Sequence, residues 1–144
     1  GLSYQGVSTL CPSHLFRDDE GTLWICRTRA EGAEVGDSCT SRVPLLKPAM
    51  VLLEKYRGWN PMNPEGPCFP VPSVQKMNEY LKEVAARCRI SKRLTTQMAR
   101  NTFAATVTLA NRIPKEHVGE MLGYSSDYML RHYTQALERN SQKA

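Results

Sequence analysis

The feature that most constrains the fold is the segment between Thr95 and Tyr133, which reads as a series of helices with two breaks. A helix is expected to begin at Thr95 or at the threonine after it, because a threonine hydroxyl can accept a hydrogen bond from an unpaired N–H of the first turn. Apolar residues then recur every three to four positions up to residue 110, as along one face of a helix. Pro114 suits the first turn of a second helix and Gly123 suits its end, so the sequence predicts a helix–break–helix unit here.

A third helix is expected from about Ser126 to Arg139. Three short patterns stand in order along the whole segment: an arginine at Arg100, Leu122-Gly123 followed by the aromatic Tyr124, and His132-Tyr133 near the C-terminus. One such pattern alone would be weak. Three in this order, with helix breaks between them, make a specific signature.

These patterns resemble the C-terminal half of the tyrosine recombinases, the phage-integrase family of site-specific DNA strand-exchange enzymes. The family's H-x-x-R box is matched by Gln97 to Arg100, its L-G-[HW] box by Leu122 to Tyr124, and its nucleophile by Tyr133. The resemblance covers nearly all of the 144 residues. It implies one tyrosine recombinase catalytic domain over residues 1–144, an α+β fold that is mostly helical with a small three-stranded antiparallel sheet.

The N-terminal third predicts the strands of that sheet. Strands are expected at residues 14–16, 22–28 and 40–46, with a turn at 18–21 that is rich in acidic residues and ends in glycine. The chain opens inside what resembles the family's T-G-L-R-x-x-E/D box. The family's N-terminal DNA-clasping domain is therefore expected to be absent, as in a truncated chain.

Two further helices are expected between the sheet and the C-terminal segment. Pro48 opens one that Gly58 closes, and Ser73 caps another over residues 74–89. Between them, residues 59–72 contain five prolines and predict an extended surface loop. The second helix carries one apolar stripe, which predicts a buried face: Val74, Met77, Leu81, Val84 and Cys88.

Charge is unevenly distributed along the chain, whose net charge is +5. Residues 1–72 carry 7 Lys/Arg against 8 Asp/Glu, a net charge of −1, whereas residues 73–144 carry 12 against 6, a net charge of +6. A basic C-terminal half suits contact with phosphates, and each phosphate that is neutralised makes binding more sensitive to salt.

The five cysteines are scattered and show no spacing typical of a metal site, so free thiols in a reducing compartment are expected. No apolar run approaches 18 residues and no signal peptide is recognisable, which favours a soluble protein of the cytoplasm without membrane contact. By the resemblance, this would be the integrase of a mobile genetic element in a bacterial cytoplasm, associated with the nucleoid when bound to DNA.

Breaking a DNA phosphodiester without a metal requires several groups held around one phosphorus. By the resemblance, Tyr133 is the nucleophile that becomes joined to the 3′ phosphate, and Arg100 helps to stabilise the extra negative charge of the transition state. A general acid protonates the leaving 5′ oxygen, and a general base assists the tyrosine. No metal or small-molecule cofactor is expected.

Several positions depart from the family's set. Ser3 replaces the first arginine, Gln97 replaces a histidine, and Tyr124 replaces a second histidine or tryptophan. Gln97 lies three residues before Arg100, which predicts that both side chains can reach one phosphate, but an amide cannot exchange a proton near pH 7. Arg29 stands for the usual lysine. Arg27 alternates with it on one face of a strand, so one of the two can reach the space that Ser3 leaves.

The expected catalytic residues are Tyr133, Arg100, Arg29, Arg27, Gln97 and Tyr124. The expected DNA contacts are Arg100, Arg27, Arg29, Arg131, His132, Lys92 and Arg93. The expected partners are duplex DNA and a second copy of the chain, which would associate through the C-terminal helix.

Three functions remain open at this point. The first is site-specific recombination through a covalent 3′-phosphotyrosine intermediate, with a partly degenerate catalytic set. The second is a recombinase-fold DNA-binding or accessory protein that no longer cleaves. The third is a small helix-turn-helix regulator, which is the least favoured because a regulator gives no reason for the three patterns to occur in this order.

Overall fold

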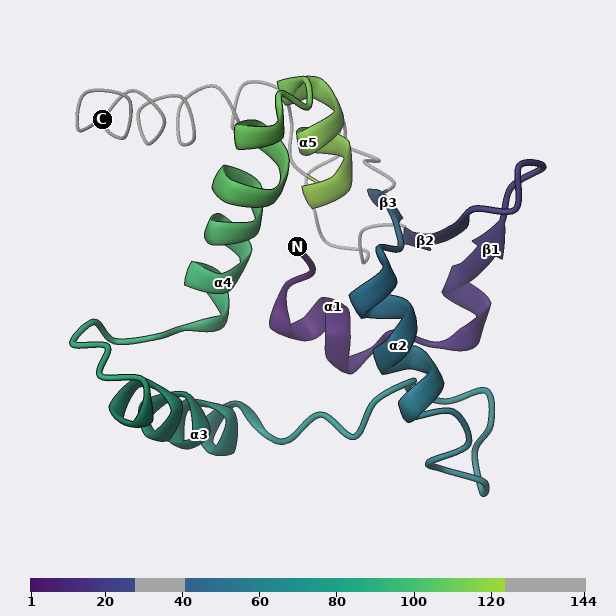
Figure 1. Ribbon diagram of the computed structural model, residues 1–144. Helices are drawn as coiled ribbons and strands as arrows, with labels where there is room; N and C mark the ends of the chain where they lie inside the picture. The colour runs from purple at the N-terminus through teal and green to yellow at the C-terminus, as the bar shows by residue number, and fades with distance from the viewer. Residues whose placement is uncertain (28–40, 124–144) are drawn as a thin grey trace, which may run out of the picture.

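The computed structural model describes residues 1–27 and 41–123 of the chain (Figure 1). Within these residues it shows an α+β arrangement of five α-helices and one three-stranded antiparallel sheet, which confirms the general class that the sequence predicts. The expected third helix of the C-terminal segment lies outside the described residues.

The sheet has the order β1-β2-β3, with β2 in the middle. Its strands are β1 (Leu15–Arg17), β2 (Leu23–Arg27) and β3 (Ser41–Pro44), and each neighbouring pair is antiparallel. Ile25 of β2 pairs with Val43 of β3, and both side chains are buried. The two thus form the buried face of a sheet that is otherwise only partly covered.

The side chain of Asp18 makes two of the hydrogen bonds that hold the hairpin between β1 and β2. Asp18 accepts hydrogen bonds from the backbone N–H of Thr22 at 2.8 Å and from the indole Nε1 of Trp24 at 2.7 Å. Gly21 takes a positive φ of 81° in the same turn, a conformation that glycine adopts without strain. The indole hydrogen bond is the main cause that lowers the pKa of the Asp18 carboxyl.

Thr95, Ser73 and Gly123 cap helices as the sequence predicts, whereas the helix that Gly58 was expected to close ends at Lys55. The helices are α1 (Tyr4–Ser8), α2 (Lys47–Lys55), α3 (Val74–Arg87), α4 (Thr96–Thr102) and α5 (Lys115–Leu122). The hydroxyl of Thr95 accepts from the backbone N–H of Met98 at 3.1 Å, and the hydroxyl of Ser73 accepts from that of Lys76 at 3.3 Å. Gly123 follows α5 in the left-handed conformation, with φ of 66°.

The helix expected up to residue 110 changes character halfway. After α4 the chain continues as a π-helical segment (Phe103–Thr108) and a 3₁₀ turn (Leu109–Asn111). Two threonine hydroxyls bond back to carbonyls four residues earlier: Thr106 to Thr102 at 2.7 Å and Thr108 to Ala104 at 2.6 Å. Such bonds compete with the backbone ladder and bend helices, which accounts for the departure from a regular α-helix.

The main core cluster joins this π-helical segment to α5. Ala104, Val118 and Leu122 are buried together, and Phe103 and Ile113 pack against them. Figure 1 shows α5 beside the upper end of α4 and close to β3. The hydroxyl of Ser41 donates to the carbonyl of Met121 at 2.8 Å, so the start of β3 is tied to the last turn of α5.

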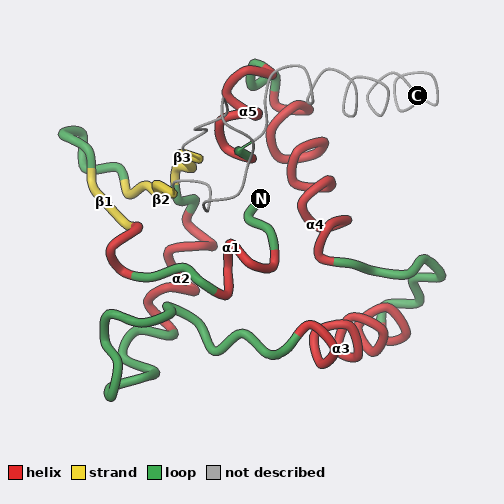
Figure 2. The backbone as a smooth tube through the Cα atoms, turned by 180° about the vertical axis from the view of Figure 1, so that it is seen from behind, coloured by secondary structure: helices red, strands yellow, loops and turns green. Residues whose placement is uncertain are grey.

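The apolar stripe of α3 is not part of this core, which corrects the sequence-based prediction. Val74 is 55% exposed, Val84 is 47% exposed and Cys88 is also exposed, while only Ala85 of this helix is buried. Figures 1 and 2 show α3 at the edge of the molecule, joined to its neighbours by long loops on both sides. A periodic apolar stripe shows that a helix is amphipathic. Whether that face is buried depends on another segment of the chain packing against it.

A matched pair of valines tests this arrangement. Val118→Ala is expected to lower the free energy of unfolding by about 2–3 kcal/mol, because Val118 is fully buried and a cavity would remain. Val84→Ala is expected to change it by less than about 0.5 kcal/mol, because half of that side chain is already in water. Both valines lie in helices, so the difference in helix propensity cancels. If urea denaturation shows that both variants lose the same free energy of unfolding, Val84 of α3 is packed as tightly as Val118 of α5.

Candidate functional site

Arg100 is a buried arginine at the junction of α4 and α5. It is only 8% exposed, and its guanidinium donates a hydrogen bond from Nη2 to the carbonyl of Leu122. Leu122 is the last residue of α5, where carbonyls lack a partner inside the helix. A cation at a helix C-terminus also interacts favourably with the helix dipole. Arg100 therefore binds the C-terminal end of α5.

Gly1 lies against the same junction. A Cβ built on Gly1 would come within 2.5 Å of Cδ1 of Phe103 and 2.9 Å of Cδ2 of Leu122, so the backbone approaches both side chains closely. Burial lowers the pKa of the Gly1 amino group to about 6, and the nearby positive charge of Arg100 lowers it as well. Gly1 thus lies close to Arg100 of α4 and to Leu122 of α5.

Arg27, at the end of β2, is bound to α1. Its guanidinium donates from Nη1 to the carbonyl of Gly6 and from Nη2 to the hydroxyl of Thr9, the latter at 2.7 Å. The hydroxyl of Ser3 caps the same helix, accepting from the backbone N–H of Gly6 at 3.0 Å. The charge of Arg27 also reaches His14, whose pKa is lowered first by burial and then by this guanidinium.

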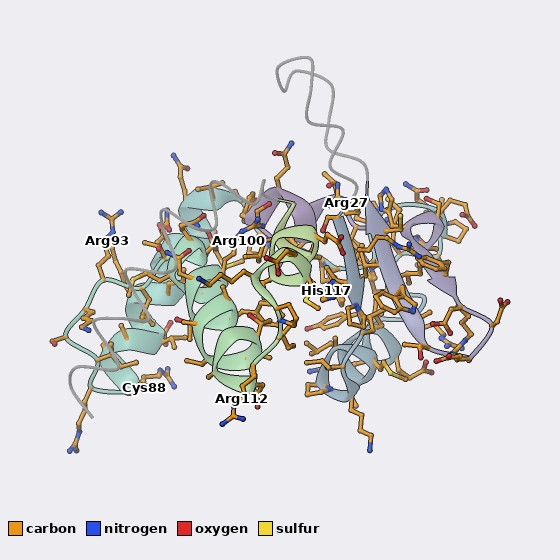
Figure 3. All side chains as sticks on the ribbon, turned by 90° about the horizontal axis from the view of Figure 1, so that it is seen from above. Arg27, Cys88, Arg93, Arg100, Arg112 and His117 are labelled. Carbon is orange, nitrogen blue, oxygen red and sulfur yellow. The ribbon has the colours of Figure 1, made fainter. Side chains whose placement is uncertain are left out.

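The surroundings of Gly6 show how near Arg27 comes to Ser3. A Cβ built on Gly6 would lie 3.3 Å from the Ser3 hydroxyl and 3.6 Å from Nη1 of Arg27. The guanidinium of Arg27 thus lies near Ser3, the position at which the sequence resemblance expects an arginine. Figure 3 shows α1, in purple, between the labelled Arg27 and Arg100.

Gln97 lies on the outer side of α4. Its side chain is exposed, and its amide nitrogen donates to the side-chain oxygen of Asn101 at 2.9 Å. Arg100, one turn later, is buried toward α5 instead. The structure therefore does not show the shared orientation that the three-residue spacing predicts.

The remaining expected residues divide into two groups. Lys92 and Arg93 lie exposed on the connection between α3 and α4, and Figure 3 shows Arg93 at the edge of the molecule, away from Arg27 and Arg100. The others lie outside the described residues: Arg29, Tyr124, Arg131, His132 and Tyr133.

One residue that supports this region carried no signal in the sequence. Ser41 bonds the carbonyl of Met121, 80 positions later, and so connects β3 to the α5 end that Arg100 also holds. A single serine at the start of a strand has no pattern that distinguishes it from other surface serines. Only the tertiary fold reveals this contact.

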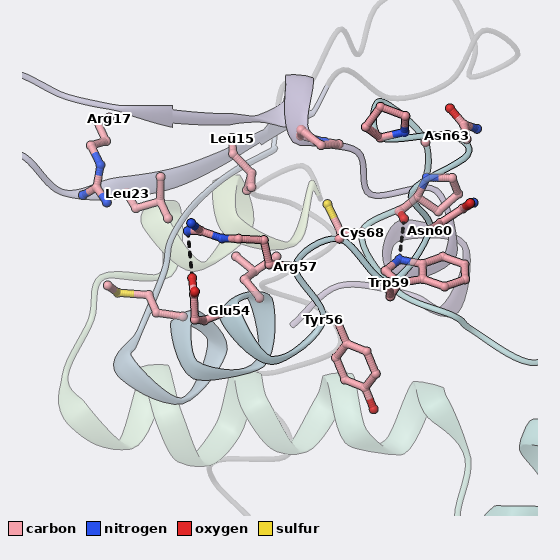
Figure 4. A pocket seen from close by; sticks show the side chains of 17 residues that line it. Leu15, Arg17, Leu23, Glu54, Tyr56, Arg57, Trp59, Asn60, Asn63 and Cys68 are labelled. Atoms are coloured by element: carbon pink, nitrogen blue, oxygen red, sulfur yellow. Dashed lines mark hydrogen bonds and ion pairs between the residues drawn. The ribbon is translucent and has the colours of Figure 1, made fainter.

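A pocket of about 540 Å³ lies in another part of the molecule (Figure 4). It is an open pocket lined by the β1–β2 hairpin, the C-terminal end of α2 and the proline-rich loop, and neither Arg27 nor Arg100 lines it. At its rim Arg57 and Glu54 form an ion pair at 2.7 Å, and the indole of Trp59 donates to the carbonyl of Pro67 at 3.0 Å. The pocket is thus separate from the region around Arg100.

The described part of the chain holds neither a cluster of metal ligands nor a helix that could span a membrane. Over residues 1–27 and 41–123, no group of three or more His, Cys, Asp or Glu side chains is placed to hold a metal ion. None of the helices in these two ranges is both long enough and apolar enough to cross a membrane.

The internal role of Arg100 can be tested by stability. Arg100→Ala is expected to lower the free energy of unfolding by about 2–3 kcal/mol, because it leaves the carbonyl of Leu122 buried without this donor. Arg93→Ala serves as the control and is expected to change stability by less than about 0.5 kcal/mol, since Arg93 is exposed on a loop. Similar, small losses for both variants in thermal and urea denaturation would contradict the internal role.

Compared with known protein families, curated proteins and solved structures, the chain shows no significant match.

Proposed function

We propose that this chain is the catalytic domain of a tyrosine recombinase and that it acts on duplex DNA. One observation carries the proposal: Arg27 and Arg100, far apart in the sequence, hold the two places where the resemblance puts catalytic groups. Arg27 binds the helix that Ser3 caps, and Arg100 binds the turn that precedes Tyr124. These contacts support the proposal because they place one guanidinium beside each of the two regions.

The chemistry assigned to this region is transfer of a phosphoryl group without a metal. The oxygen of Tyr133 attacks the phosphorus and the bond to the 5′ oxygen breaks, which leaves the 3′ phosphate joined to the tyrosine. The tyrosine proton passes to a base, and the leaving 5′ oxygen takes up a proton from an acid. Extra negative charge builds up on the phosphate oxygens, and the planar guanidinium groups of Arg27 and Arg100 match two oxygens at once.

For a DNA phosphate to bind these arginines, it must replace acceptors that they now bind within the protein. Arg100 donates to a neutral carbonyl in the described structure, and Arg27 donates to a carbonyl and a hydroxyl. A phosphate oxygen carries negative charge and is a stronger acceptor than any of these. We infer that DNA binding draws each guanidinium toward the phosphate and loosens the end of α5 and the end of α1.

A second function, DNA binding without cleavage, is favoured by Gln97 on the outer side of α4. Gln97 stands where the family has a proton-transferring histidine, and its amide is engaged with Asn101. General acid–base groups contribute about 10²–10⁴-fold each to a rate, so their loss can make cleavage too slow to matter. Both functions require DNA binding, and only recombination requires a covalent intermediate.

A nicked suicide DNA substrate separates the two functions. Recombinase activity predicts a covalent protein–DNA band in a denaturing gel, which Tyr133→Phe abolishes because the attacking oxygen is gone. Tyr80→Phe is the matched control, since Tyr80 is an exposed tyrosine on α3, and it should leave the band unchanged. Gln97→His together with Tyr124→His should strengthen the band by restoring proton-transfer groups.

Two results would contradict parts of the proposed chemistry. One is a band that persists in Tyr133→Phe, which would assign the nucleophile elsewhere. The other is a folded Gln97→His/Tyr124→His variant that binds the substrate yet forms no band. The second result would leave DNA binding without cleavage as the function.

Salt dependence tests the DNA contact itself. Each phosphate that is neutralised contributes about 0.9 to the slope of log K against log salt. The double variant Lys92→Ala/Arg93→Ala is expected to reduce that slope by nearly 2 and to weaken binding to all sequences alike. The control Lys47→Ala/Arg57→Ala removes two exposed cations from the acidic half of the chain and should leave the slope unchanged. A slope that responds equally to both double variants would show that these two loop residues are not specific contacts.

A further inference from the structure

Two cysteines that are distant in the sequence are brought together beside the pocket. Cys11 precedes the 3₁₀ turn Pro12–His14, and Cys68 lies in the proline-rich loop. The backbone N–H of Cys68 donates to the carbonyl of Leu10 at 2.6 Å. That carbonyl belongs to the peptide bond that leads into Cys11, so the two cysteines lie across a direct backbone contact.

Covalent geometry limits how far apart these cysteines can be. The oxygen of a trans peptide lies about 2.8 Å from the next Cα, and a backbone nitrogen lies about 1.5 Å from its own Cα. With the 2.6 Å hydrogen bond between them, the Cα atoms of Cys11 and Cys68 are separated by at most about 7 Å. Disulfides form across Cα separations of roughly 4.4–6.8 Å.

The electrostatics of the pair agree with this proximity. Burial raises the pKa of the Cys68 thiol, and the negative charge of a Cys11 thiolate raises it further. Each thiol is partly exposed and can be reached by a small reagent. The sulfur of Cys11 donates only a weak hydrogen bond, to the carbonyl of Thr9 at 3.4 Å, so little holds it away from Cys68.

We propose that Cys11 and Cys68 form an intramolecular disulfide when the chain meets a small-molecule disulfide. The Cys11 thiolate attacks one sulfur of the reagent and releases one small thiolate, which leaves a mixed disulfide on Cys11. The Cys68 thiolate then attacks the Cys11 sulfur and expels the second small thiolate. The protein loses two electrons and two protons, and the reagent gains both as two thiols.

The bond would close a ring that contains all three strands and α2. Its closure restricts the unfolded chain more than the folded one, because the folded chain already holds the two ends together. It would also fix one wall of the pocket, since Cys68 and Pro12 both line it. The reduced and oxidised chains would therefore differ in stability and in the freedom of the proline-rich loop.

Peptide mapping of the full chain tests the proposal. The protein is incubated with oxidised glutathione, remaining thiols are blocked, and a tryptic digest is analysed without reduction. The expected product joins the peptide of residues 1–17 to that of residues 58–76, each of which holds one cysteine. The melting temperature should rise by about 5–15 °C on oxidation and fall back when a reductant is added.

Single substitutions make the test specific. Cys11→Ser and Cys68→Ser should each remove both the joined peptide and the rise in melting temperature, and either one suffices if the other fails to fold. Cys88→Ser is the matched control and should retain both, since Cys88 is an exposed thiol directly after α3. Glutathione found on Cys11 or Cys68 without the joined peptide, or a bond from either one to another cysteine, would overturn the proposal.

Discussion

The hydrogen bond from Arg100 to the carbonyl of Leu122 is the contact on which the C-terminal part of the described structure depends. α5 is a short helix, and its last carbonyl would otherwise be buried without a strong donor. The guanidinium supplies that donor and places a positive charge at the negative end of the helix dipole. With Ser41 bonded to Met121, the end of α5 is fixed from both α4 and β3, and the core cluster of Ala104, Val118 and Leu122 closes around it.

The same arginine serves two purposes in the proposed function. A residue that stabilises a turn through a neutral carbonyl can also meet a charged phosphate, provided that it exchanges one acceptor for another. Arg27 is in a comparable position against Gly6 and Thr9 of the α1 region. DNA binding would then be coupled to the positions of α1 and of the end of α5, because each arginine binds one of them in the free protein.

Local signals in the sequence predicted most of the helices and strands, and long-range contacts account for what it missed. Thr95, Ser73 and Gly123 act where the sequence places them, since caps and left-handed glycines depend on a few neighbouring residues. The exposure of Val84 was not predictable, because a stripe does not reveal whether another segment covers it. The orientation of Gln97 toward Asn101 was likewise undetermined by spacing alone.

The proline-rich loop has a consequence for the association of the chain with itself. β1 is an edge strand, and an edge strand can pair with a strand of another molecule and begin aggregation. The loop runs beside this hairpin, where Pro64 and Pro67 line the pocket together with Leu15 and Arg17 of β1. Proline has no N–H to donate, so the loop can lie next to the sheet without extending it as a fourth strand. A short edge beside such a neighbour makes β1 a poor template for intermolecular β-sheet.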